Sequence, residues 1–318
     1  MNDSPAPGAG RYAPSPSGAL HLGNLRTAML AWLFARSTGR RFLMRIEDVD
    51  RERDAGAAAG QLADLAAIGL DWDGEPVVQS DRRPAHDAAI ERLARAGLVY
   101  ECTCTRREIL EAPSAPHAPP GAYPGTCRDR TPAEQRAARE RIAPRRPALR
   151  LRVPEGTRPP AYEDALLGHC GGTAGAIDDL VLRRGDGAIA YNLAVVVDDA
   201  AMGVDQIVRG DDLASSTPRQ ILLQRLLGLP SVPRVTYAHV PLVLGPGGAR
   251  LAKRDGAVTL ADLAREGIDA DRVRGVLAES LGLAARGERV DPAALITRFD
   301  PGRLPRSPWL WSPDAFRA

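Results

Sequence analysis

The pattern of hydrophobic and polar positions divides the first part of the chain into short helical and strand-like segments. Apolar residues recur at helical spacing from about Leu25 to Arg36, and Gly39 marks the end of that helix. The extended stretch RYAPS and a turn rich in glycine, proline and serine precede it, and the apolar run FLMRI follows it. This order of strand, turn, helix and strand predicts a compact βαβ unit.

Similar segments continue along the chain. Helical patterns that end at a glycine cover residues 56–68, 84–96 and 217–227. Strand-like patterns cover residues 148–153, 206–212 and 235–244. The apolar run IAYNLAVVVDD is interpreted as a long buried strand that ends in Asp198 and Asp199. Proline, glycine and cysteine crowd together from residue 100 to about 146, which indicates an inserted module.

Several polar residues stand where the expected strands end. They are the turn of residues 11–24, Glu47, the pair Asp198 and Asp199, and Arg209. In an open α/β sheet, ligands bind beyond the carboxyl ends of the strands. We therefore expect these residues to share one pocket.

The composition is that of an ordinary globular protein, with 44% hydrophobic and 26% charged residues among 318. A net charge of +2 does not by itself indicate nucleic-acid binding, so an RNA surface would depend on local clustering of arginine. No apolar run is long enough to span a membrane, and the few cysteines favour a reducing, cytoplasmic location. Residues 1–10 lack the features of a signal peptide and are expected to be a disordered leader.

The segment PSPSGALHLGN, residues 14–24, combines a tight turn with the start of a helix. Free N–H groups at a helix N-terminus form an anion site. His21 and Asn24 lie three residues apart, on one face of the first turn, where both can donate to a phosphate. The alternative is a loop with a capping asparagine and a surface histidine.

The segment LAKRDG, residues 251–256, contains Lys253, the only lysine among 42 basic residues. Lysine and arginine are least interchangeable where a compact point charge is needed, as on a polyphosphate. Lys253 is therefore a candidate phosphate ligand, with an ordinary solvated turn as the alternative. Arg209 has a simpler alternative as an ion-pair partner of Asp211 or Asp212.

Three cysteines of the inserted module have the spacing of a structural zinc site, namely Cys102, Cys104 and Cys127. A fourth ligand is needed, and the residues alone leave His117 and Cys170 open. The alternative is a set of buried thiols without metal. A module this poor in apolar residues needs a further stabilising cross-link, which favours a bound metal ion.

Taken together, the motifs resemble class I aminoacyl-tRNA synthetases of the glutamyl group. PSPSGALHLGN resembles their HIGH signature, RLAKRDG their KMSKS loop, and YNLAVVVDD with IVRGDDL the region between the two. The resemblance runs from Arg11 to about Thr259. It implies an enzyme that activates glutamate with ATP and Mg²⁺ and then transfers it to a tRNA.

The resemblance also implies a role for particular residues. For ATP and catalysis these are His21, Asn24 and Lys253. For glutamate they are Arg11, Tyr12, Ala13, Pro14, Ser15, Glu47, Tyr191 and Arg209. For one structural zinc ion they are Cys102, Cys104, Cys127 and, as the fourth ligand, Tyr123. Arg11 and Arg209, with Tyr191 and Ser15, suit the two substrate carboxylates, and Glu47 suits the ammonium group.

The implied fold is α/β, a Rossmann-like parallel sheet with an inserted zinc-binding module and a small helical C-terminal region. The expected divisions are 1–10, 11–99 for the first half of the catalytic domain, 100–188 for the insert, 189–245 for the second half, and 246–318. Only 65 residues follow Lys253, too few for the anticodon-binding region of glutamyl-tRNA synthetases.

This departure points to a truncated branch of the family, which transfers glutamate to queuosine in the anticodon of tRNA(Asp). We expect it to act as a monomer. Three alternatives remain open: a minimal glutamyl-tRNA synthetase that charges a 3′ end, a class I nucleotidyltransferase without an RNA partner, and a non-catalytic RNA-binding relic.

Overall fold

The computed structural model describes residues 8–50, 52, 54–111, 122–172, 177–229, 235–249, 251 and 258–316. Its centre is a seven-stranded sheet with the order β3-β2-β1-β9-β10-β6-β7. The strands are β1 (Ala9–Tyr12), β2 (Arg41–Ile46), β3 (Val77–Val78), β6 (Tyr162–Asp164), β7 (Gly168–Cys170), β9 (Val204–Gly210) and β10 (Thr236–Val240). Neighbouring strands pair in parallel, except that β7 runs antiparallel to β6. The expected parallel α/β sheet is confirmed.

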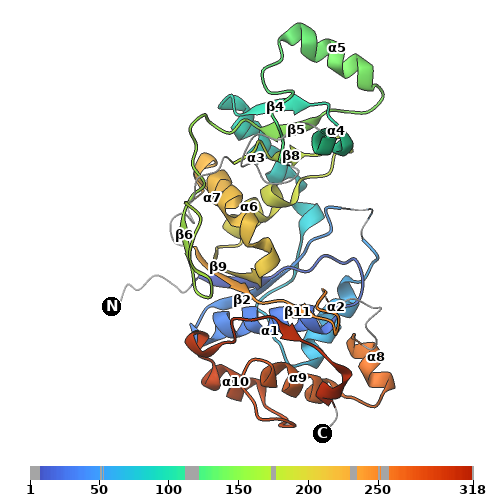
Figure 1. The fold of residues 1–318 in the computed structure, drawn as a ribbon, viewed down its shortest axis with the longest axis vertical. Helices are drawn as coiled ribbons and strands as arrows, with labels where there is room; N and C mark the ends of the chain where they lie inside the picture. Colours follow the sequence, from blue (N-terminus) through green and yellow to red (C-terminus); the bar gives the residue numbers. More distant parts are fainter. Residues whose placement is uncertain are drawn as a thin grey trace.

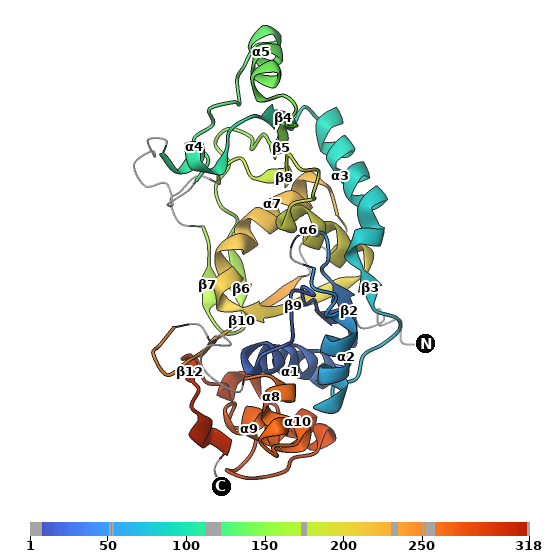
Figure 2. The same ribbon diagram turned by 90° about the vertical axis from the view of Figure 1, so that its right-hand side faces the viewer.

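Helices cover both faces of this sheet (Figures 1 and 2). On one face lies α1 (Leu22–Ser37), backed by α8 (Leu260–Arg265), α9 (Ala270–Glu279) and α10 (Pro292–Arg298). On the other face lie α3 (Arg83–Arg95), α6 (Tyr191–Ala201) and α7 (Thr217–Leu226), while α2 (Ala58–Ala67) follows β2 along the chain. Two short strands, β11 (Val243–Leu244) and β12 (Trp309–Leu310), tie the C-terminal region to the catalytic half.

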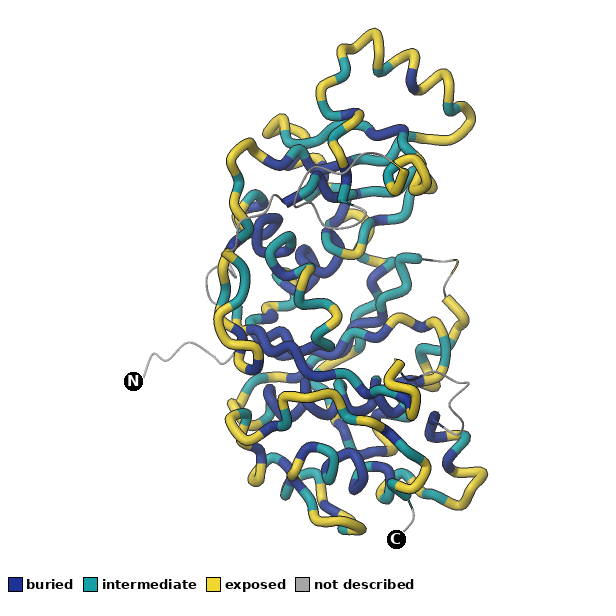
Figure 3. The backbone as a smooth tube through the Cα atoms, in the orientation of Figure 1, coloured by how far each residue is buried: buried dark blue, intermediate teal, exposed yellow. Residues whose placement is uncertain are grey.

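Helix α1 is buried almost all round its circumference. It packs between the sheet and the C-terminal helices, where Phe34 meets Phe299 edge to face at 5.1 Å. A helix that is apolar on every side requires such a sandwiched position. Figure 3 shows the same buried layer running through the middle of the molecule. The C-terminal region thus completes the main core.

The inserted module is a small antiparallel sheet at the end of the molecule opposite the C-terminal helices (Figure 2). It contains β4 (Val99–Cys102), β5 (Ala148–Leu151) and β8 (Val181–Arg183), with α4 (Arg106–Glu111) and α5 (Pro132–Ile142) outside it. Helix α5 is mostly exposed at the tip (Figure 3). The first strand of the module, β4, begins at Val99.

The interpretation of residues 189–199 as a strand is wrong. Residues 191–201 form helix α6, and its residues Leu193–Asp199 are all buried between the sheet and helices α3 and α7. A short apolar run is compatible with a buried strand or with a buried helix. The three consecutive valines of this run favour the strand. Burial on several sides of the helix explains the run. Asp198 and Asp199 therefore stand in the last turn of a helix, not at the end of a strand.

The other expected elements are found with small shifts at their ends. Helix α1 begins at Leu22, three residues earlier than its periodicity suggests. Strand β1 begins at Ala9, inside the range expected as a leader, and residues 1–7 lie outside the described residues. Within the described ranges, no helix is long and apolar enough to cross a membrane.

The order of the strands locates a binding crevice. β1 is followed by β2 on one side, whereas its other neighbour, β9, lies far along the chain. Ligands of open α/β sheets bind at such a switch point, beyond the carboxyl ends of the strands. β1 leads there into the turn of residues 13–18, β2 into Glu47, and β9 ends at Gly210.

Candidate active site

The start of α1 is closed by reciprocal hydrogen bonds between His21 and Asn24. His21 Nδ1 accepts from the N–H groups of Gly23 at 3.0 Å and Asn24 at 3.3 Å, and Asn24 Oδ1 accepts from the His21 N–H at 3.2 Å. The capping alternative is thus realised by the same two residues that were expected to meet a phosphate. Because Nδ1 is the acceptor, the ring proton resides on Nε2, which makes that nitrogen a donor.

The turn before α1 is held by a buried glutamine from α2. Gln61 Nε2 donates to the carbonyl oxygens of Ser15 at 3.0 Å and Gly18 at 2.7 Å. The Pro16 oxygen accepts from the N–H of Ala55 at 2.9 Å. Loop backbone held in this way is pre-organised for a ligand rather than ordered by it.

Lys253 lies outside the described residues, but both flanks of its loop are described. The N–H of Leu22 donates to Val258 O at 2.9 Å, and His21 forms an isolated antiparallel bridge with Thr259. On the other flank, Leu251 N donates to the carbonyl of Val243 in β11 at 3.3 Å. Leu251 and Val258 are both buried. The loop therefore leaves and rejoins the fold beside the N-terminus of α1.

Behind the crevice, two arginines converge on one carboxylate. Asp199 Oδ1 accepts from Arg11 Nε at 3.2 Å and from Arg45 Nη1 at 2.5 Å, and Arg45 Nη2 donates to Glu47 Oε1 at 2.9 Å. Burial raises the pKa of Asp199, but Arg11 and Arg45 outweigh it and hold that pKa below the usual range. For Glu47, burial prevails and raises the pKa despite Arg45. The network leaves Glu47 at the cleft with a strong preference for a cationic neighbour.

Arg209 is held by neutral groups rather than by Asp211 or Asp212. Its Nε donates to His239 at 3.1 Å, Nη1 to Gln220 at 2.8 Å and Nη2 to Thr217 at 2.7 Å. The simple ion-pair alternative is therefore wrong. A buried guanidinium whose acceptors among the described residues are all neutral keeps an uncompensated positive charge, which favours an anionic ligand.

The pKa of Tyr191, at the first position of α6, responds to the charges around the crevice. Loss of hydration raises the pKa of Tyr191, and the carboxylate of Glu47 raises it further, while Arg209 and Arg11 lower it. Glu47, Arg209 and Arg11, which were expected to meet glutamate together with Tyr191, are thus close enough to influence its hydroxyl group. Two further members of that set are fixed by hydrogen bonds: Tyr12 OH donates to Asn24 O at 3.2 Å, and Pro14 O accepts from Glu47 N at 2.9 Å, while Ala13 lies between them in the chain.

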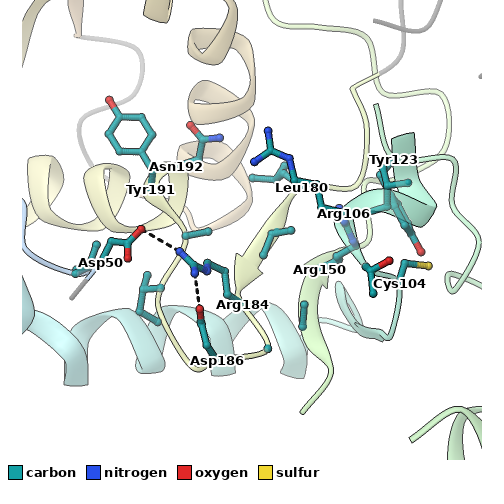
Figure 4. A pocket seen from close by; sticks show the side chains of 18 of the residues that line it. Asp50, Cys104, Arg106, Tyr123, Arg150, Leu180, Arg184, Asp186, Tyr191 and Asn192 are labelled. Carbon is teal, nitrogen blue, oxygen red and sulfur yellow. Dashed lines mark hydrogen bonds and ion pairs between the residues drawn. The ribbon is translucent and has the colours of Figure 1, made fainter. Parts of the chain in front are cut away.

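A cleft of about 1520 Å³ connects this region to the inserted module. Ser15, Glu47 and Tyr191 line it at the catalytic side. Figure 4 shows Tyr191 and Asn192 at one side, Tyr123, Cys104 and Arg150 at the other, and Arg184 between them, joined to Asp50 and Asp186. The cleft is large enough for more than an amino acid and a nucleotide.

The expected metal ligands come together in the module. The Sγ atoms of Cys102, Cys104 and Cys127 all lie within 4.8 Å of one another, so this group could hold a metal ion. The Tyr123 hydroxyl oxygen accepts from Cys102 Sγ at 3.4 Å and from Cys127 N at 2.8 Å, which puts it beside the thiols. The neighbourhood of Cys102 and Tyr123 lowers the pKa of Cys127 to about 4, so one thiolate of the kind that a metal needs is already favoured.

Two other possible ligands fare differently. Cys170 pairs with Tyr162 in the β6–β7 hairpin of the main sheet, outside the cluster. His117 lies outside the described residues. Burial raises the pKa of Tyr123, so a bound metal would have to supply the free energy of its deprotonation. The guanidinium of Arg150 favours the phenolate form of Tyr123, because it lies over the Tyr123 ring, 3.7 Å from the centroid.

Several residues that build the site were not foreseen as site residues, among them Arg45, Asp164 and His239. Arg45 and His239 are polar residues within the apolar runs FLMRI and TYAHV, and Asp164 is the buried last residue of the short strand YED. Such a residue must be paired when it is buried. That contrast with its neighbours was the available signal.

The fold and the crevice are those of a class I synthetase. Residues 9–287 match the family described as tRNA synthetases class I (E and Q), catalytic domain. The chain therefore belongs to the class I tRNA synthetase family of the glutamyl and glutaminyl type.

Within that family, the chain is similar to proteins called glutamyl-Q tRNA(Asp) synthetase. The protein of that name from Nocardia farcinica is 62% identical over 315 residues, which are 98% of this chain and 96% of that one. The protein of that name from Symbiobacterium thermophilum is 50% identical over 311 residues, 94% of each chain. Among solved structures, the glutamate-tRNA synthetase from Elizabethkingia anophelis matches with a TM-score of 0.81 and 26% identity, over 98% of this chain and 69% of that one.

Proposed function

We propose that the protein activates glutamate with ATP and transfers the glutamyl group to queuosine in the anticodon of tRNA(Asp). The observation that carries the proposal is the 62% identity to a protein named glutamyl-Q tRNA(Asp) synthetase over nearly the full length of both chains. The charged crevice at the switch point of the sheet supports the first step. The cleft toward the inserted module supports the second.

In the first step, a carboxylate oxygen of glutamate attacks the α-phosphorus of ATP, and pyrophosphate leaves. His21 Nε2 and the side-chain amide of Asn24 hold phosphate oxygens, and Lys253 belongs to the neighbouring loop, whose described flanks lie beside them. Binding by fixed donors stabilises the charge that develops on the phosphate without reorganisation. Mg²⁺ accompanies ATP and supplies further neutralisation of the phosphates.

Glutamate is recognised by complementary charge. Arg209, with its excess positive charge, takes one carboxylate, and Arg11 contributes to the same cationic floor. Glu47 accepts from the ammonium group, and Tyr191 and Ser15 supply hydrogen bonds at the rim. A bound ammonium group would offset the cost of ionising Glu47 in its buried position.

The inserted module holds one structural zinc ion through Cys102, Cys104, Cys127 and Tyr123. Three thiols and one further ligand suit tetrahedral Zn²⁺ better than the hard, oxygen-preferring cations. The metal fixes β4 to the loop of residues 122–127 and so shapes one wall of the cleft that takes the RNA.

The experiment that tests the proposal separates its two steps. Glutamate-dependent exchange of pyrophosphate into ATP should proceed without any tRNA, because glutamate and ATP complete the pocket. Labelled glutamate should then appear on tRNA(Asp) that contains queuosine, but not on tRNA(Asp) that lacks it. The label should survive removal of the 3′-terminal adenosine. Label on tRNA(Glu) that is lost with that adenosine would instead identify a glutamyl-tRNA synthetase.

A further inference from the structure

A buried row of polar side chains lies behind the crevice, formed by Asp164, His239 and Arg209. They come from β6, β10 and β9, which are adjacent strands, and His239 and Arg209 stand directly opposite each other in the ladder. His239 is fully buried, and Asp164 and Arg209 are each only 5% exposed. Buried polar side chains are nearly always hydrogen-bonded, so the partners of each group show how it is held.

The hydrogen bonds fix the tautomer of His239. Arg209 Nε and Thr217 Oγ1 both lie 3.1 Å from His239 Nε2. Because an arginine nitrogen can only donate, Nε2 must be the acceptor, and the proton must reside on Nδ1. That nitrogen lies 2.6 Å from Asp164 Oδ2, which accepts it.

Asp164 is itself fixed by backbone groups. Its Oδ1 accepts from the N–H groups of Leu166 and Leu167, each at 2.9 Å. Although burial opposes ionisation, the hydrogen bonds from His239 and from these N–H groups lower the pKa of Asp164 to about 2. The carboxylate is therefore a permanent acceptor that selects the Nδ1–H form of His239.

The consequence falls on Arg209. Its Nε, Nη1 and Nη2 each hold one neighbour, namely His239, Gln220 and Thr217. Of its five N–H groups, these bonds use three, and within the described part of the chain one on each terminal nitrogen is left for a ligand. A guanidinium that keeps two donors can bind the two oxygens of a carboxylate.

We propose that His239 and Asp164 are positioning residues for the glutamate carboxylate bound by Arg209, an inference that rests on the proposed function. Asp164 holds His239 in the Nδ1–H form, and His239 in turn holds the Arg209 guanidinium by its Nε–H. With the opposite tautomer, an N–H of His239 would face the Nε–H of Arg209. The guanidinium would then rotate away from the geometry that receives the substrate.

Asp164→Asn tests the tautomer with little change in shape. The amide oxygen of the introduced side chain can still accept from Leu166 and Leu167, while its NH₂ group faces His239 Nδ1 and turns that nitrogen into an acceptor. The proton must then move to Nε2, opposite Arg209. His239→Leu is the partner variant, because its side chain carries no group that could link residue 164 to Arg209.

The two variants form a double-mutant cycle, read by glutamate-dependent pyrophosphate exchange. We expect Asp164→Asn to raise the KM for glutamate at least about tenfold, with kcat and the KM for ATP changed less than about threefold. His239→Leu should itself raise the KM for glutamate, because Arg209 Nε loses its acceptor, and adding Asp164→Asn to it should change the KM by less than about twofold. An equal rise in both backgrounds would show a merely structural role for Asp164 and overturn the inference.

A measurement without substrate keeps the test independent of the variants' folding. The ¹⁵N resonances of the His239 ring should show the Nδ1–H form in the wild-type protein, and an Nε2–H form there would overturn the inference. His86→Gln is the matched control, since His86 is equally buried against Asp198 but away from the crevice, and its KM for glutamate should stay at the wild-type value. Absence of glutamate-dependent exchange by the wild-type protein would overturn the proposed function, whereas exchange with a misassigned tautomer would overturn this inference alone.

Discussion

Asp199 and Arg45 form an ion pair behind the cleft, with Oδ1 and Nη1 only 2.5 Å apart. The Arg45 side chain has no exposed surface, and that of Asp199 is 5% exposed. Asp199 also holds Arg11, so this one carboxylate from α6 fixes arginines from two neighbouring strands. The last turn of α6 therefore sets the charge geometry of the crevice.

Asp199→Ala should strongly destabilise the protein, because it leaves two buried guanidinium groups without their partner. We expect a loss of about 3 to 5 kcal/mol in the free energy of unfolding, measured in urea. Asp205→Ala is the control, since Asp205 pairs with Arg40 at 2.9 Å but both side chains are more than a fifth exposed. That variant should lose less than about 1 kcal/mol. Equal losses would contradict the structural role assigned to Asp199.

Asp164 should make the free energy of unfolding depend on pH. Its pKa is about 2 in the folded protein, below the value of about 3.8 in the unfolded chain, so its contribution is present above about pH 4 and is lost as the pH falls toward 2. The difference in unfolding free energy between the wild type and Asp164→Asn should narrow by roughly 1 kcal/mol from pH 6 to pH 3. Urea titrations at the two pH values measure it. A difference that stays constant would mean that folding does not lower the pKa of Asp164.

Gly23→Ala should disturb the phosphate end of the site. A Cβ at this position would lie 2.9 Å from His21 Cε1 and 3.0 Å from Nδ1, so the imidazole would be pushed off the start of α1. We expect pyrophosphate exchange to fall at least about tenfold and stability to fall by about 1 kcal/mol. Gly60→Ala, in an open part of α2, is the control and should stabilise the helix without affecting exchange. Normal exchange by Gly23→Ala would exclude a role for the orientation of His21.

The central fold was predictable because its signals are local. The turn and helix of residues 14–37 and the strand after them follow from glycine stops and from periodicity within short windows. Helix α6 could not be predicted from its local sequence, because its apolar run is explained only by the layers that cover it on both sides. Its correct assignment needs the packing of α3 and α7, which no local pattern contains.

The candidate site divides in the same way. His21 and Asn24 interact within one helical turn, so their spacing in the sequence is enough to predict that they lie together. Asp164 and His239 act on residues far away in sequence, and their partners follow from the strand order β9-β10-β6, whereas the partners of Asp199 follow from the packing of α6 on β1 and β2. A polar residue in an apolar strand indicates a buried partner, but the sequence does not tell which one.

The metal site should contain one zinc ion per chain. Elemental analysis after purification without added metal should find it, and Cys127→Ser should remove it. Tyr123→Phe should weaken retention against a chelator, while His117→Ala should retain the metal as the wild type does. Retention by Tyr123→Phe together with loss by His117→Ala would show that the fourth ligand is His117. Absence of zinc, with no uptake on addition, would exclude the metal altogether.

The last prediction concerns Lys253, whose loop is anchored on both flanks beside the start of α1. His21 presents an Nε2–H at the same place, so a cation in this loop would meet the same phosphates. Lys253→Arg keeps the charge but replaces a compact ammonium with a wider planar group. We expect adenylate formation to fall at least about tenfold, about 1.4 kcal/mol of transition-state stabilisation.

The KM for glutamate should barely change in this variant, because Arg209, Arg11 and Glu47 lie on the opposite face of the sheet from α1. Arg225→Lys, a reciprocal exchange in the exposed last turn of α7, controls for the change in residue type and should leave both quantities unaltered. A loss confined to the rate of adenylation would separate the phosphate end of the site from its glutamate end. Full activity in Lys253→Arg would mean that any cation in this loop suffices, and that the single lysine of the chain carries no specific role.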